Sequence, residues 1–116
     1  MQLPERFSDA DLEKIVDDGL IYMCACPAQV AVATRKVREM YRYQLNCLQD
    51  QKNDSRVHAT IAKTAEAVHA QLEECMEEIL AIEQWDRQTL TMPAHLRKRQ
   101  LVELGADSKA ADLSGQ

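Results

Sequence analysis

Two cysteines two residues apart, Cys24 and Cys26, are the side chains of this sequence best suited to chemistry, because thiolates bind soft metal ions and act as nucleophiles. On a continuous helix, residues at this spacing point to nearly opposite sides and do not share a ligand. Pro27 follows directly, and proline disfavours a helical conformation in the residue before it while suiting the first position of a new helix. We therefore expect a helix to start at Pro27, with Cys26 as its non-helical cap and both sulfurs able to face one point.

A third thiol is predicted to lie at the same end of the molecule. If the second and third predicted helices form an antiparallel hairpin, Cys75 is level with the start of the second helix. Cys24, Cys26 and Cys75 then predict a site for zinc or another thiophilic metal, with His95, Glu78 or a bound small molecule as the fourth ligand. Two other interpretations stay open: Cys75 is a buried core residue, and Cys26 is a redox-active or thiol-transfer group.

The longest predicted helix, residues 55–84, contains neither glycine nor proline. Its apolar positions are separated alternately by four and three residues, which is typical of left-handed, coiled-coil-like packing. These positions are Ile61, Ala65, Val68, Leu72, Cys75, Ile79 and Ile82. At 1.5 Å per residue this helix is about 45 Å long, longer than either of the others. We expect a short C-terminal helix or a second copy of the chain to cover its surplus apolar surface, and we predict a dimer.

Two further long helices precede it. Ser8 is predicted to cap the first, whose apolar positions are Leu12, Ile15, Val16, Leu20 and Met23. The second covers residues 27–48 and is expected to bury Val30, Thr34, Val37, Tyr41, Gln44 and Leu48. Its opposite side carries Arg35, Lys36, Arg38 and Arg42, which are expected to pair with the acidic third helix. Asp54 or Ser55 is predicted to cap that third helix.

Composition agrees with this helical interpretation. The chain has 116 residues, of which 46% are hydrophobic, with three glycines and three prolines. Net charge alternates in sign along residues 1–26, 27–53, 54–86 and 87–116, starting negative, which favours an up-and-down arrangement of neighbouring helices. We therefore predict an all-α, up-and-down helical bundle of three long helices plus a short C-terminal helix from Pro93 to Leu104. Residues 1–105 form the single domain and residues 106–116 a disordered tail.

Other titratable residues suggest no joint site. His58 and His69 are about 16 Å apart along one helix, so they do not bind one ion, and each is expected to flank the core with one ring edge in water. Four glutamates of the third helix, at positions 73, 74, 77 and 78, are expected to form a solvated face. The basic residues 95–99 are too few to indicate nucleic-acid binding in an acidic chain.

No phosphate-binding loop, nucleophile and base, or paired acid and base is recognisable, so no enzymatic activity is predicted. No apolar run is long enough to span a membrane and the start of the chain has no signal-peptide pattern, so a cytoplasmic location is expected. We predict a small helical interaction or regulatory module whose partner is a second copy or another helical protein, with an exposed apolar patch. The alternative is a metal-binding or thiol-redox protein that uses Cys24 and Cys26.

Overall fold

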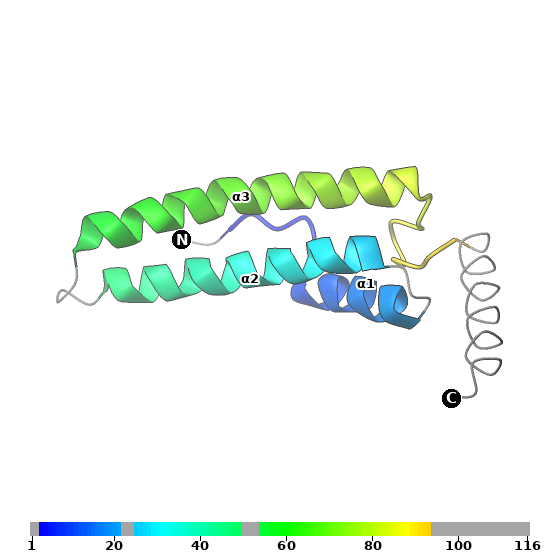
Figure 1. The fold of residues 1–116 in the computed structure, drawn as a ribbon, viewed down its shortest axis with the longest axis horizontal. Helices are drawn as coiled ribbons and strands as arrows, with labels where there is room; N and C mark the ends of the chain where they lie inside the picture. The colour runs from blue at the N-terminus through cyan, green and yellow to red at the C-terminus, as the bar shows by residue number, and fades with distance from the viewer. Residues whose placement is uncertain (1–2, 22–24, 50–53, 94–116) are drawn as a thin grey trace, which may run out of the picture.

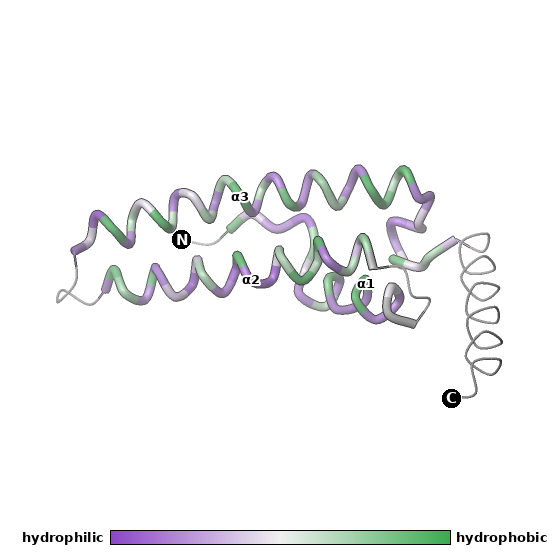
Figure 2. The backbone as a smooth tube through the Cα atoms, viewed as in Figure 1, coloured by the Kyte–Doolittle hydropathy of each residue, from purple (hydrophilic) through white to green (hydrophobic). Residues whose placement is uncertain are grey.

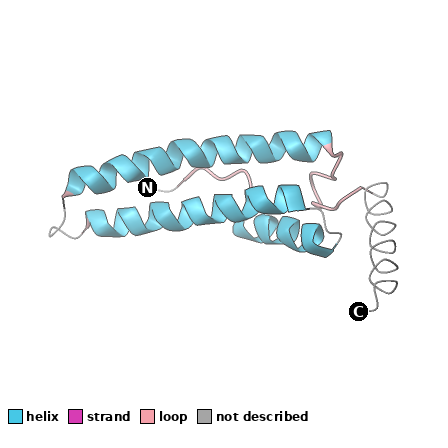
Figure 3. Ribbon diagram, in the orientation of Figure 1, coloured by secondary structure: helices cyan, strands magenta, loops and turns pink. Residues whose placement is uncertain are grey.

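The computed structural model describes residues 3–21, 25–49 and 54–93 (Figure 1). They form three helices, α1 (Asp9–Ile21), α2 (Ala25–Leu48) and α3 (Ser55–Ile82). Figure 3 shows a loop segment before α1 and another after α3. No strand occurs in the described ranges. The prediction of an all-helical fold with three helices is confirmed. The predicted helix from residue 93 to 104 and the predicted tail fall almost wholly outside the described residues.

The three helices run up, down and up. α2 and α3 form a long antiparallel hairpin, and α1 lies along the first half of α2, so that α2 is between the other two helices in this view (Figure 1). The main core gathers at the end of the hairpin that α1 covers, where α1, α2, α3 and the loop after α3 meet. Its buried members are Phe7, Leu12, Ile15, Ala31, Met76, Leu80, Trp85, Leu90 and Met92.

Local capping explains where two of the helices begin. The backbone N–H of Ser8 donates to Oδ2 of Asp11 at 2.9 Å, and the N–H of Asp11 donates to Oγ of Ser8 at 3.0 Å. This reciprocal pair satisfies donors that have no partner inside α1. At the start of α3 the side chain of Asp54 accepts from the N–H of Arg56 at 2.9 Å. Both predicted caps are confirmed.

The start of α2 differs from the prediction. The helix begins at Ala25, so Cys26 lies in its first turn rather than outside it, and Pro27 is a fully buried residue of that turn. The first four N–H groups of a helix have no acceptor within the helix, so proline's missing N–H is tolerated throughout the first turn. Further along α2, the predicted burial of Thr34, Tyr41 and Gln44 is confirmed, whereas Val30, Val37 and Leu48, also expected to be buried, are half-buried.

α3 is unbroken, as predicted, but a different line of residues is buried. The buried residues are Ala62, Ala65, His69, Glu73, Met76 and Leu80, which share only Ala65 with the predicted stripe. The other predicted positions are half-buried, except Ile82, which is 79% exposed. The chain segments that pack on α3 determine which of its sides is buried. That side includes two polar residues, His69 and Glu73.

One of those segments is the loop after α3. Gln84 and Leu90 adopt left-handed backbone conformations, with φ of 63° and 54°, and the chain turns back so that Trp85, Leu90 and Met92 enter the core. Asp18 of α1 fixes the end of this loop, because its Oδ2 accepts from the N–H of Met92 at 2.9 Å. The loop therefore covers part of the end of α3 that we expected a C-terminal helix or a second copy to cover.

Candidate functional site

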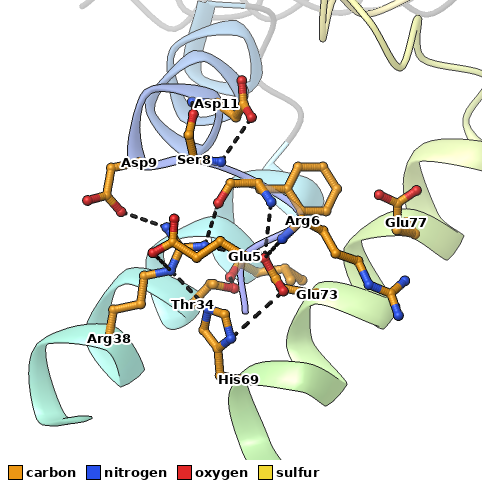
Figure 4. Close-up of polar contacts among 12 residues, drawn as sticks. Glu5, Arg6, Ser8, Asp9, Asp11, Thr34, Arg38, His69, Glu73 and Glu77 are labelled. Atoms are coloured by element: carbon orange, nitrogen blue, oxygen red, sulfur yellow. Dashed lines mark hydrogen bonds and ion pairs between the residues drawn. The ribbon is translucent and has the colours of Figure 1, made fainter. Parts of the chain in front are cut away.

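A cluster of buried polar side chains joins α2, α3 and the residues before α1 (Figure 4). Arg38 of α2 is 2% exposed, and His69 and Glu73 of α3 are 1% and 2% exposed. Removing charged groups from water is costly unless each finds charged and hydrogen-bonding partners. The hydrogen-bonding partners of these three residues therefore show whether the cluster holds the fold together or leaves polar atoms available to a ligand.

Glu73 holds the chain segment that precedes α1. Its Oε2 accepts from the backbone N–H groups of Arg6 and Phe7 at 2.7 and 3.1 Å, and from Nη2 of Arg38 at 3.3 Å. The carboxylate thereby supplies an acceptor for backbone N–H groups that lie outside any helix or strand. We call residues 3–8 the N-terminal segment; in Figure 1 it runs between α2 and α3.

Arg38 completes the attachment from the opposite helix. Its Nη2 donates to the carbonyl oxygen of Phe7 at 2.5 Å, its Nη1 to Oδ1 of Asp9 at 2.6 Å, and its Nε to Nε2 of His69 at 2.9 Å. The guanidinium thus bonds α1, α3 and the N-terminal segment at once. Its planar, fixed set of donors suits this role, which a lysine ammonium does not reproduce.

His69 is held in its neutral form with a defined tautomer. A guanidinium can only donate, so Nε2 of His69 must accept and the ring proton resides on Nδ1. Burial lowers the pKa of His69, and the charge of Arg38 lowers it further, while Glu73 and Glu5 oppose the shift. Nδ1 lies 3.8 Å from Oε1 of Glu73, too far for a hydrogen bond. The imidazole therefore acts as an acceptor for Arg38.

This arrangement predicts a pH dependence of stability. The pKa of His69 is lowered by folding, so the unfolded chain binds a proton at His69 from about pH 6.5 downward, whereas the folded chain binds it only at a lower pH. The free energy of unfolding should therefore fall as the pH falls below about 6.5, by at most about 1.4 kcal/mol per pH unit from this residue. His69→Gln, which keeps an acceptor for Arg38, should have a shallower slope in urea unfolding measured between pH 7.5 and 5.5. Equal slopes for the two proteins would contradict this account of His69.

A pocket of about 430 Å³ lies beside the cluster, lined by side chains that include Glu5, Tyr41, Glu66 and His69. Tyr41 is buried and its hydroxyl donates to Oε1 of Glu66 at 3.1 Å. Burial raises the pKa of Tyr41, and the bond to Glu66 and its charge raise it further, so the phenol stays protonated. The bonds of His69 to Arg38 and of Tyr41 to Glu66 join α2 to α3, while Arg38 and Glu73 attach the N-terminal segment to both helices.

This cluster was not predicted from the sequence. Glu73 was expected on a solvated face, His69 beside the core with one ring edge in solvent, and Arg38 on the outer side of its helix. All three are buried. The expected pairing of α2 arginines with acidic α3 is confirmed for Arg38 and Glu73. An available signal was Phe7, the only phenylalanine of the chain, directly before the cap residue Ser8, because an apolar residue there commonly packs back on the fold.

The cysteines occupy separate environments. Cys26 is exposed in the first turn of α2, and Cys75 is half-buried on α3. Cys24 lies outside the described residues, so the three-thiolate site stays a prediction. Among the residues that are described, no group of three histidine, cysteine, aspartate or glutamate side chains is arranged to hold a metal ion.

The α2–α3 hairpin has one apolar side that the described chain leaves uncovered. Half-buried or exposed apolar residues recur at helical spacing on both helices, and Figure 2 shows apolar residues along the full length of α3. On each helix these residues lie beside the buried line, on the side away from Arg38 and Glu73, which hold the N-terminal segment. We call this set the open face. It consists of Val30, Ala33, Val37 and Met40 of α2 and Ile61, Val68, Leu72, Cys75 and Ile79 of α3.

The open face contains no charged residue, and a polar pair ends it near the hairpin loop. There Nδ1 of His58 lies 2.6 Å from Oε1 of Gln44. Met40 is 39% exposed, and the inner edges of Val30, Val37 and Ile79 pack against the buried clusters. None of the described helices is long and apolar enough to cross a membrane. No family model, curated protein or solved structure matches this chain.

Proposed function

We propose that this protein is a helical interaction module that buries the open face of its α2–α3 hairpin against the helices of a partner. The observation that carries the proposal is the line of partly exposed apolar side chains on both helices. On α2 this line runs from Val30 to Met40 and on α3 from Val68 to Ile79, and none of its members is charged. Apolar surface rimmed by polar residues on a small domain marks a binding surface.

The shape of the open face indicates what kind of partner fits. Two antiparallel helices packed side by side leave a shallow groove between them, and a further helix fills such a groove with residues at i, i+3, i+4 and i+7. Because no charge lies within the face, the partner surface must be apolar as well, with its charged residues at the rim. The buried polar cluster supports this role by fixing α2 and α3 relative to each other from the opposite side.

A synthetic amphipathic helix tests the proposal. We expect a fluorescent peptide of about 21 residues, with leucine at the a and d heptad positions and mixed lysine and glutamate elsewhere, to bind with an affinity in the micromolar range. A peptide of the same composition in scrambled order is the control. Binding is measured by fluorescence anisotropy, and the contact surface by changes in backbone amide chemical shifts.

The proposal requires the shift changes to centre on Val37 and Leu72 and to spare the pocket beside Tyr41. Leu72→Glu should weaken peptide binding by about 30-fold or more, as loss of a central contact does. Ala67→Glu, an exposed position of the same helix outside the open face, should leave binding unchanged. Equal binding of both peptides, or shift changes on another surface, would refute the proposal.

A further inference from the structure

We infer that the partner on the open face is a second copy of this chain, so that two α2–α3 hairpins stack face to face into a four-helix core. This inference rests on the proposed function and adds the identity of the occupant. An open face without charges is complementary to itself, because two copies bury only apolar side chains against each other. A charged partner surface would leave charges buried without counter-charges.

The charges outside the open face select the relative placement of the two hairpins. The exposed charged residues that border the open face at helical spacing are Lys36 of α2, three residues after Ala33, and Glu78 of α3, three residues after Cys75. α2 of one copy therefore lies over α3 of the other rather than over the other α2, which brings a basic edge against an acidic edge. In this placement every helix is antiparallel to both neighbours, as in up-and-down four-helix bundles.

The size of the open face is sufficient for a reversible dimer. The open face extends about 27 Å along α3, from Ile61 to Ile79, and about 15 Å along α2, from Val30 to Met40, and each helix is about 10 Å wide. About 400 Å² of each copy is therefore covered, giving a total of about 800 Å², the size of a weak, transient interface. An interface of this size predicts a dissociation constant in the micromolar range, so monomers and dimers coexist at concentrations accessible to sedimentation.

Sedimentation equilibrium of the full chain tests the inference. The wild type should change from monomer to dimer between about 1 µM and about 1 mM. Leu72→Glu should raise the dissociation constant by about 30-fold or more, while Ala67→Glu should not change it. Met40→Glu, on the α2 half of the face, should act in the same way as Leu72→Glu and serves if that variant does not fold. Helical circular dichroism shows whether each variant is folded.

Cys75 provides a native reporter within the proposed interface. Alkylation followed by peptide mass spectrometry should show Cys75 of the wild type reacting several-fold more slowly at high than at low protein concentration, and Cys75 of Leu72→Glu reacting at the same rate at both. A wild type that stays monomeric throughout the range, or a dimer that Leu72→Glu and Met40→Glu leave intact, would overturn the inference. Peptide binding to the open face of a monomeric protein would keep the proposed function and refute only self-association.

Discussion

Replacing Arg38 with methionine is expected to lower the free energy of unfolding by about 3–5 kcal/mol, because it leaves the buried carboxylate of Glu73 without its counter-charge. The substitution also removes the donors to the carbonyl oxygen of Phe7 and to His69. Methionine fills much of the same volume, so the loss reports the charge and the hydrogen bonds rather than a cavity. Urea unfolding monitored by circular dichroism at neutral pH measures it.

Two further variants separate this effect from a general one. Arg35→Met, at an exposed position of the same helix, should change stability by no more than about 0.5 kcal/mol. Adding Glu73→Gln to Arg38→Met should restore part of the loss, because the double variant no longer buries an unpaired charge. If Arg38→Met is no more destabilising than Arg35→Met, the polar cluster does not hold the fold together.

Phe7→Ala should have a comparable effect by a different physical route. The Phe7 ring is 0% exposed in the main core, and the guanidinium of Arg87 lies 4.1 Å above its centroid. Truncating a buried phenylalanine to alanine costs about 3–5 kcal/mol through lost apolar burial and the cavity that remains. The ring also anchors the N-terminal segment, so the variant should lose protection of the Arg6 and Phe7 amides in hydrogen exchange.

Phe7→Leu is the matched control, because it keeps an apolar side chain in the same place and should cost less than about 1.5 kcal/mol. Arg87→Ala removes the contact above the ring but leaves the core filled, so its loss should be much smaller than that of Phe7→Ala. A Phe7→Ala protein with wild-type stability and wild-type amide protection would show that the N-terminal segment is not part of the folded core.

Local signals in the sequence identified the helices and their caps, because these depend on neighbouring residues. Ser8 with Asp11, and Asp54 with Arg56, satisfy their helix ends with side chains at most three residues away. The inward side of α3 depends on the N-terminal segment and the loop after α3, which no local pattern reveals. The apolar heptad pattern was therefore assigned to the core, whereas most of it belongs to the open face.

The polar cluster was missed for the same reason. Glu73 looks like a surface residue until the backbone of Arg6 and Phe7 is placed against it, and that contact joins residues 67 and 66 positions apart. Sequence patterns indicate which residues are apolar, but they do not indicate where a carboxylate will find backbone donors. Among the thiols, Cys26 lies in a helical turn because α2 begins at Ala25, two residues before Pro27.

The attachment of the N-terminal segment also has a consequence for the order of folding. Its hydrogen bonds to Glu73 connect residues 66 and 67 positions apart, whereas the α2–α3 hairpin closes through a short loop. Long-range closure loses more chain entropy than local closure, so the hairpin should form before the segment docks. Contacts made after the rate-limiting step govern how fast a native chain opens, not how fast it forms. Arg38, Glu73 and Phe7 therefore mainly lower the rate constant of unfolding, and this rate constant sets the lifetime of the folded state.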